Sequence, residues 1–125
     1  MKNIIIDTDP GHDDALAIML AVKSGKFTIH AITTVAGNSN IENTTRNARY
    51  ILALLKQKDI PVYSGADKPL SRELIQAVVH GKSGLEGIDP TNPAELTGDA
   101  VEKIISLVET VPNITIIALG PLTNI

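Results

Sequence analysis

Apolar positions along the 125-residue chain alternate between short continuous runs and longer segments with a helical period. The short runs are rich in β-branched residues and predict strands at residues 4–6, 27–35, 61–63 and 114–119. The helical periods predict helices at residues 13–23, 41–56 and 99–110. This alternation predicts an α/β fold: a parallel, Rossmann-like sheet with helices on both faces.

The predicted helices differ in the pattern of their apolar residues. Residues 13–23 are apolar almost all round, which favours a helix packed against a sheet over a surface helix. In residues 41–56 the pattern is amphipathic, with Ile51, Leu54 and Leu55 assigned to one face.

Residues 66–97 are interrupted repeatedly by glycine and proline, and we expect at most one short helix there, near residues 72–79. An excursion of this length in a compact domain is usually functional or disordered. The chain has no internal repeat or linker, so residues 1–125 are predicted to form a single α/β domain.

Composition narrows the classes of partner. Hydrophobic residues make up 43% and charged residues 20%, a balance typical of globular proteins. The net charge of -3 and the lack of basic runs disfavour polymeric nucleic acid. Without cysteine, any metal must be held by oxygen or imidazole. The first apolar run is too short for a signal peptide or membrane span, so we expect no membrane partner and a cytoplasmic location.

Four carboxylates, those of Asp7, Asp9, Asp13 and Asp14, lie within eight residues, across the end of the first strand and the start of the first helix. In parallel sheets of this class, ligands bind at the carboxyl ends of the strands. One interpretation is local: Asp13 and Asp14 favour the positive end of the helix and Asp9 caps the turn. It does not explain why Asp7 and Asp9 flank a single residue, because like charges repel unless a cation or protons intervene.

A metal site is therefore the interpretation we favour. Carboxylates and main-chain carbonyls suit hard cations, Ca²⁺ or Mg²⁺. Calcium accepts more and looser ligands, so a site shared with a diol would favour calcium.

Residues 7–15 (DTDPGHDDA) closely resemble the DxDPGxDDxxA signature of the inosine-uridine preferring nucleoside hydrolase family. Five further segments resemble that family's later motifs in the same order: residues 31–38 (AITTVAGN), 45–48 (TRNA), 62–66 (VYSGA), 80–84 (HGKSG) and 118–124 (ALGPLTN). The resemblance extends along the whole chain, and a collinear set is more specific than any one motif.

The resemblance implies calcium-dependent hydrolysis of the N-glycosidic bond of ribonucleosides, giving ribose and free base. It implies that Asp9 binds Ca²⁺ and accepts the proton of the attacking water. Asp14 would bind the same ion, and Leu119 would contribute its main-chain carbonyl oxygen. Asp7 would support the turn without touching the ion.

The substrate-binding residues are implied in the same way. Asp13 would hydrogen-bond the ribose 2'-hydroxyl, Asn38 would support the water, Asp9 and the ribose, and His80 would approach the leaving base. We expect His12 and His30 to be an ordinary turn residue and an ordinary strand residue. These roles suit the chemistry, because cleavage builds positive charge on the ribose and carboxylates stabilise that charge.

Family members are longer than this chain. The resemblance implies that their later segments supply a final aspartate ligand, contacts to the 5'-hydroxyl and a histidine that acts as an acid near the base. We therefore expect an incomplete nucleoside hydrolase fold that lacks part of the site. The family also implies a homo-oligomer, a dimer or tetramer, whereas the preference for purine or pyrimidine bases is left open.

Two alternatives remain at this stage. The first is a non-catalytic, truncated α/β domain with weak or no calcium binding, which could oligomerise through an unfinished sheet edge. The second is an aspartyl-phosphate phosphatase, because an apolar strand followed by Asp-x-Asp is also typical of that class, with Asp7 as the nucleophile. Pro10-Gly11 and the Asp13-Asp14 pair fit the phosphatase pattern poorly.

Overall fold

A computed structural model of the chain describes residues 1–87 and 96–125. Its four strands form one parallel sheet in the order β3-β2-β1-β4. The strands are β1 (Lys2–Thr8), β2 (Phe27–Thr34), β3 (Val62–Ser64) and β4 (Thr115–Ala118). The helices of the described residues are α1 (His12–Ser24), α2 (Ile41–Leu54) and α3 (Ala100–Thr110), followed by the short 3-10 helix η1 (Leu122–Asn124).

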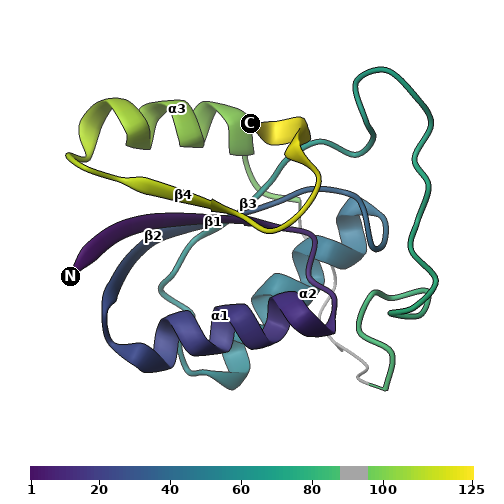
Figure 1. The fold of residues 1–125 in the computed structure, drawn as a ribbon, viewed down its shortest axis with the longest axis horizontal. Coiled ribbons are helices and arrows are strands. Elements are labelled where there is room, and N and C mark those ends of the chain that lie inside the picture. Colours follow the sequence, from purple (N-terminus) through teal and green to yellow (C-terminus); the bar gives the residue numbers. More distant parts are fainter. Residues whose placement is uncertain (88–95) are drawn as a thin grey trace.

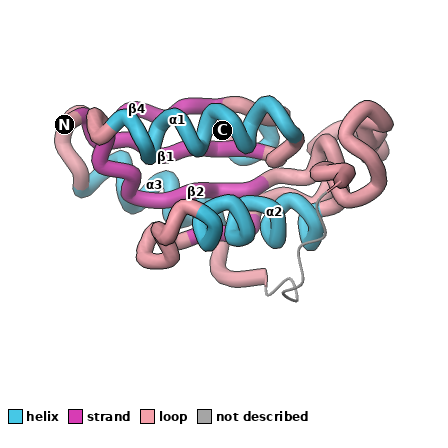
Figure 2. The backbone as a smooth tube through the Cα atoms, turned by 90° about the horizontal axis from the view of Figure 1, so that it is seen from below, coloured by secondary structure: helices cyan, strands magenta, loops and turns pink. Residues whose placement is uncertain are grey.

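The sheet lies between two layers of helix (Figure 1), with α1 and α2 on one face and α3 on the other. Seen from the side of α1 and α2, these two helices lie in front of the sheet and run roughly along its strands, while α3 lies behind it (Figure 2). The predicted α/β class, with a parallel Rossmann-like sheet and helices on both faces, is confirmed. Strand order reverses between β1 and β4, and ligands bind at the carboxyl ends of strands at such a point.

Alternation along β1 builds the two halves of the core. Ile4 and Ile6 belong to the cluster formed with α1 and α2, whereas Ile5 packs with Ile104 and Leu107 of α3. Successive side chains of a strand point to opposite faces, so an unbroken isoleucine run supplies both layers.

The two long helices, α1 and α2, differ in how well the apolar pattern predicted their buried faces. On α1, Ile18 is buried against the sheet, but Leu16 and Leu20 are exposed, so only one side of this apolar helix is covered.

On α2, the buried side includes Ile51 but excludes Leu54, which is 54% exposed. The grouping of Leu54 with Ile51 on one buried face was wrong. The buried stripe of α2 continues from Ile51 toward Ala48 and Leu52, whereas Leu54 is rotated by about 60° from Ile51 in the opposite direction.

Residues 72–79, where at most one short helix was expected, form no helix. Their apolar side chains Ile75, Val78 and Val79 are exposed, and a short helix without a packed face is marginal in water. Part of the predicted excursion, residues 88–95, lies outside the described residues.

The described part of the excursion extends beyond the carboxyl ends of the strands (Figure 1). Residues 82 and 83 are held against α2 and the loop before it: Ser39 Oγ donates to the Lys82 carbonyl at 2.6 Å, and Asn47 Nδ2 of α2 donates to the Ser83 carbonyl at 2.7 Å. The excursion is thus anchored beside the sheet end where the acidic residues lie.

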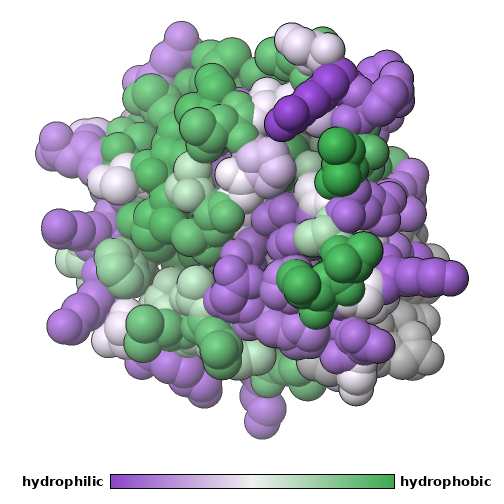
Figure 3. Space-filling view, turned by 45° about the vertical axis from the view of Figure 1, so that its right-hand side comes forward, coloured by the Kyte–Doolittle hydropathy of each residue, from purple (hydrophilic) through white to green (hydrophobic). Residues whose placement is uncertain are grey.

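Hydrophobic side chains form a continuous area on the face drawn in Figure 3. Large apolar side chains are exposed on both helix layers and near η1, among them Leu20, Ile105, Leu122 and Ile125. Across the described ranges 1–87 and 96–125, no helix combines the length and hydropathy needed to cross a bilayer.

Candidate active site

The end of β1 directs its polar side chains to opposite faces of the sheet. Asp7 points toward the side of α3 and η1, where its Oδ1 accepts a hydrogen bond from Asn124. Thr8 points toward α1, and its hydroxyl donates to Asp14 Oδ2 at 2.7 Å. The alternation of a strand therefore separates Asp7 from the carboxylates that follow it.

Asp9 is held where β1, β2 and β4 end. The main-chain N–H of Asn38 donates to Asp9 Oδ2 at 2.8 Å, and the Asn38 side-chain amide donates to the Asp9 carbonyl at 2.8 Å. Gly37 and Gly120 lie against the same carboxylate, and a Cβ at either position would overlap an Asp9 oxygen. Two glycines thus allow the loops after β2 and β4 to close on Asp9.

Asp9 and Asp14 are both buried, and their charges interact. The pKa of Asp9 is raised to about 7, first by burial and also by the nearby charge of Asp14, while the hydrogen bond from the Asn38 main chain opposes the shift. Burial also raises the pKa of Asp14, opposed by the Thr8 hydroxyl. Two carboxylates in such a setting are stabilised by a proton or by a cation between them.

The local interpretation of these aspartates fits less well. Gly11 is the N-cap of α1 and makes no side-chain capping bond, so Asp9 is not a helix cap. No group of three His, Cys, Asp or Glu side chains suited to a metal ion occurs in residues 1–87 and 96–125. A cation at Asp9 and Asp14 would therefore need additional oxygens from main chain, water or substrate.

Leu119 lies beside the same strand end. Its main-chain N–H donates to the Asp7 carbonyl at 2.8 Å, and the next residue, Gly120, contacts Asp9. This places the turn after β4 next to the Asp9 carboxylate.

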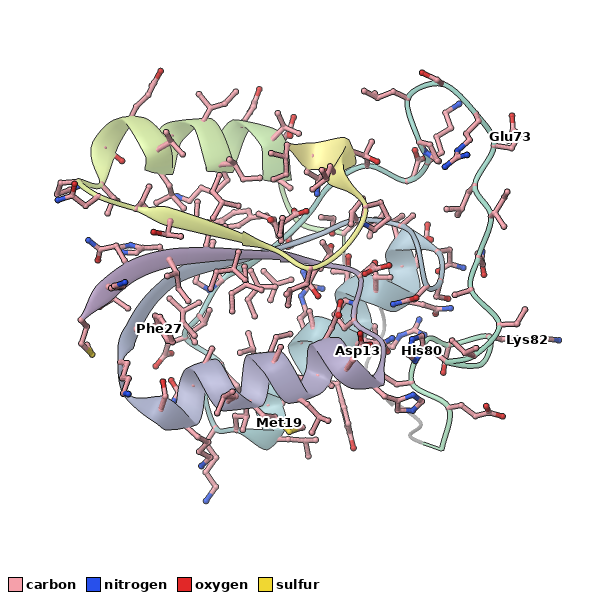
Figure 4. All side chains as sticks on the ribbon, viewed as in Figure 1. Asp13, Met19, Phe27, Glu73, His80 and Lys82 are labelled. Atoms are coloured by element: carbon pink, nitrogen blue, oxygen red, sulfur yellow. The ribbon has the colours of Figure 1, made fainter. Side chains whose placement is uncertain are left out.

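Asp13 and His80 lie together at the start of α1 (Figure 4). His80 Nε2 is 3.7 Å from Asp13 Oδ1, with the His80 side chain 17% exposed and that of Asp13 79% exposed. The His80 ring also packs over Gly11, where a Cβ would overlap it, and beside the Asn38 amide. The structure thus brings His80, from the excursion, to the first helix.

Asp7 belongs to a separate buried network. Thr33 Oγ1 and Asn124 Nδ2 donate to Asp7 Oδ1 at 2.6 Å and 2.9 Å, while Asp7 Oδ2 has no partner. Burial raises the pKa of Asp7, and these hydrogen bonds oppose the shift. Asn124 also donates to the Thr34 carbonyl and accepts from the Ala66 N–H.

Sequence reasoning assigned no role to Thr8, Thr33, Asn124 or His12. Strand alternation could have placed Thr8 on the α1 face, and Asn124 closes the last recognised motif. The contact of Thr33 with Asp7 could be predicted only from the register of β1 and β2, which pairs the two residues.

His30, in β2, contacts Asn3 near the other end of the sheet, as expected for an ordinary strand residue.

A cavity of about 400 Å³ opens beside the loops that surround Asp9. It is lined by Gly37 and Pro121, next to Asp9, and by residues 72–75 of the excursion. Its size suits a small organic ligand. Another cavity, of about 440 Å³, lies between α2 and β3, away from the carboxylates.

A model of the family described as inosine-uridine preferring nucleoside hydrolase matches residues 4–125. The chain belongs to this family. Within it, the chain is 51% identical to the pyrimidine-specific ribonucleoside hydrolase RihA of Salmonella paratyphi B, over 98% of this chain and 40% of the relative.

Solved structures of nucleoside hydrolases agree with the fold. The plant enzyme PpNRh1 is 42% identical with a TM-score of 0.89, covering 98% of this chain and 41% of the plant chain. The purine-preferring ribonucleoside hydrolase from Gardnerella vaginalis is 31% identical with a TM-score of 0.87, covering 98% and 42%. This nucleoside hydrolase chain thus spans about 40% of the length of the relatives it matches.

The phosphatase alternative fails on geometry. Its nucleophile would be Asp7, which is fully buried with one oxygen engaged by Thr33 and Asn124. An incoming phosphate could not reach this carboxylate without disrupting the network.

Proposed function

We propose that this chain provides the carboxylate cluster of a calcium-dependent ribonucleoside N-glycosidase. The observation that carries the proposal is the buried Asp9–Asp14 pair, held at the carboxyl end of β1 where strand order reverses. Family membership supplies the reaction class, hydrolysis of the bond between ribose and base.

The donor set fits a hard cation. Asp9 and Asp14 would hold Ca²⁺ together with the main-chain carbonyl of Leu119, all of them oxygen ligands. The raised pKa values support this fit, because an ion can replace the proton that the pair otherwise favours. When bound, the ion would supply a clamp for the ribose 2'- and 3'-hydroxyls and lower the pKa of a water molecule.

The role of this chain's residues follows from their positions. Asp9, fixed by two hydrogen bonds from Asn38, would accept the proton of the attacking water. Asp13, whose side chain is exposed at the start of α1, would accept a hydrogen bond from the 2'-hydroxyl. Their negative charge would stabilise the positive charge that develops on the ribose.

His80 would act on the other side of the scissile bond. It lies beside Asp13 and Gly11, from where its ring would approach the leaving base. Protonation of that base, directly or through water, would make it a better leaving group.

The relatives differ in their printed preferences, which are pyrimidine-specific for RihA and purine-preferring for the Gardnerella enzyme. The 51% identity to RihA makes pyrimidine ribonucleosides the first substrates to test. A role in nucleoside salvage, a cytoplasmic location and a homodimer or homotetramer remain predictions.

Calcium titration by calorimetry, beside hydrolysis assays with uridine, cytidine and inosine, tests the proposal. We expect saturable calcium binding that is lost in Asp9→Asn and retained in Asp67→Asn, a matched control on the exposed surface. Any hydrolysis should require calcium and disappear with the same variant.

Failure to bind calcium in the unmodified chain would overturn the proposed site and favour the non-catalytic alternative. Calcium binding without detectable turnover would support the metal site while contradicting hydrolysis by this chain acting alone.

A further inference from the structure

His12, expected from the sequence to be an ordinary turn residue, contacts His80 in two ways. Its main-chain N–H points at His80 Nδ1 at 3.3 Å, and its ring Nδ1 lies 3.1 Å from the same nitrogen. The two ring centroids are 5.3 Å apart with the planes tilted by 48°. Residues 68 positions apart in the sequence are thus joined ring to ring.

These contacts leave the two nitrogens of His80 with different surroundings. Nδ1 faces His12, whether it accepts from the His12 N–H or donates to the His12 ring. Nε2 faces Asp13 Oδ1 at 3.7 Å. His12 therefore fixes which edge of the His80 imidazole is turned toward the proposed ribose-binding residue.

The other nitrogen of His12 reaches the far end of the same loop. His12 Nε2 lies 3.0 Å from the Glu86 carbonyl oxygen, and the Glu86 N–H donates to the His80 carbonyl at 2.9 Å. The His12 ring therefore spans the base of the turn formed by residues 80–86. Both ring contacts of His12 are satisfied when His12 is the Nε2–H tautomer: Nε2–H donates to the Glu86 carbonyl, and Nδ1 accepts from His80 Nδ1–H. His80 Nε2 is then left to carry the proton proposed for the leaving base.

The loop itself has other anchors. Ser39 and Asn47 hold the carbonyls of Lys82 and Ser83, and neither contact involves His12. Lys82 points away from the site (Figure 4). Removing the His12 ring should therefore free the orientation of His80 more than the position of the loop.

We propose that His12 is a positioning residue for His80, holding Nδ1 through its ring so that Nε2 faces Asp13 and the substrate side. The proposal rests on the proposed function, because the role of His80 toward the leaving base belongs to it. The His12–His80 contact itself is a property of the free chain and is measurable without turnover.

Three substitutions separate the two contacts of the ring. His12→Asn keeps a polar group close to the place of Nδ1, the atom that contacts His80. His12→Gln keeps one close to the place of Nε2, the atom that contacts Glu86. His12→Ala removes both, and His30→Asn is the matched control, because His30 contacts Asn3 instead.

The decisive readout is the imidazole ¹⁵N spectrum of His80 in the unliganded chain. A ring fixed by hydrogen bonds keeps one tautomer, with well-separated nitrogen signals, whereas a released ring averages them. We expect averaging in His12→Ala and His12→Gln, retention in His12→Asn, and no change in His30→Asn. Backbone amide spectra should show all four variants folded.

Where hydrolysis is detectable, His12→Ala should lower kcat roughly 10- to 100-fold with little change in KM, because misplacement of a reacting group acts mainly on the chemical step. His12→Asn should recover most of the loss and His12→Gln should not. An unchanged His80 spectrum in His12→Ala, or equal behaviour of His12→Asn and His12→Gln, would overturn the inference. Absence of turnover in the unmodified chain would count against the proposed function alone, because the spectra still decide the His12 contact.

Discussion

Replacing Asp9 with asparagine should make the calcium-free chain more stable at pH 8. The carboxylate of Asp9 is buried beside that of Asp14, and its pKa is raised from 3.8 to about 7. Asparagine has nearly the same shape, keeps an oxygen to accept the Asn38 N–H, and carries no charge. The substitution therefore removes an unfavourable buried charge while preserving the packing.

The size of the effect follows from the pKa. A raised pKa in an acid means that its ionisation opposes folding, so the stability is fully present below about pH 4 and is lost as pH rises to about 7. A shift of about three units corresponds to about 4 kcal/mol at 1.36 kcal/mol per unit. Because the asparagine amide must still be desolvated, we expect a net gain of about 2 to 4 kcal/mol at pH 8.

Urea unfolding at pH 4 and pH 8, with chelator or with calcium, measures this gain. At pH 4 the variant and the unmodified chain should differ little, since Asp9 is then protonated. With calcium at about 100 times its dissociation constant, the unmodified chain should gain about 2.7 kcal/mol and the variant nothing. Asp67→Asn, on the exposed surface, is the control and should leave both differences unchanged.

The result that refutes the reasoning is a calcium-free Asp9→Asn chain that is less stable than the unmodified chain at pH 8. A variant that keeps the full calcium response would equally contradict the assignment of Asp9 as a ligand.

Three further predictions concern the surroundings of the site. Asp14→Asn should lower the pKa of Asp9 below about 7, measured by NMR titration, yet leave it above 3.8 because burial is the larger cause; an unchanged value would show that the two charges do not interact. Asn124→Ala should cost about 2 to 4 kcal/mol in urea unfolding, since it strips a donor from buried Asp7 and from the Thr34 carbonyl, and a loss below about 1 kcal/mol would contradict this. Gly37→Ala should weaken calcium binding by about tenfold or more in calorimetry, because the new Cβ displaces the Asp9 carboxylate; unchanged affinity with an intact fold would exclude that displacement.

The fold was predictable because its signals are local. Runs of β-branched residues and helical periods predicted the four strands and three α-helices of the described residues to within a few residues. The failure arose where tertiary packing decides: Leu54 was grouped with Ile51 but lies just off the buried stripe of α2. Residues 72–79 were expected to form at most one short helix, and they form none because this segment has no surface to cover.

The candidate site was predictable to the extent that topology alone brings residues together. Asp9 and Asn38 follow neighbouring parallel strands, so their proximity follows from the sheet. The contact of His80 with His12 depends on how the excursion folds back, and the partner of Asp7 depends on a register that shifts between Ile4 and Ile5. The functional roles of all these residues remain predictions.

The bond between Asn124 and Asp7 has a consequence for protein synthesis, because its two residues are 117 positions apart. At roughly 5 to 20 residues per second, a ribosome needs roughly 6 to 23 seconds to travel from one to the other. During that interval the Asp7 carboxylate at the end of β1 lacks the hydrogen bond that the Asn124 amide donates to it. This part of the protein therefore completes its folding late. A nascent chain stalled before residue 124 should leave it open to solvent, whatever the state of the helices already made.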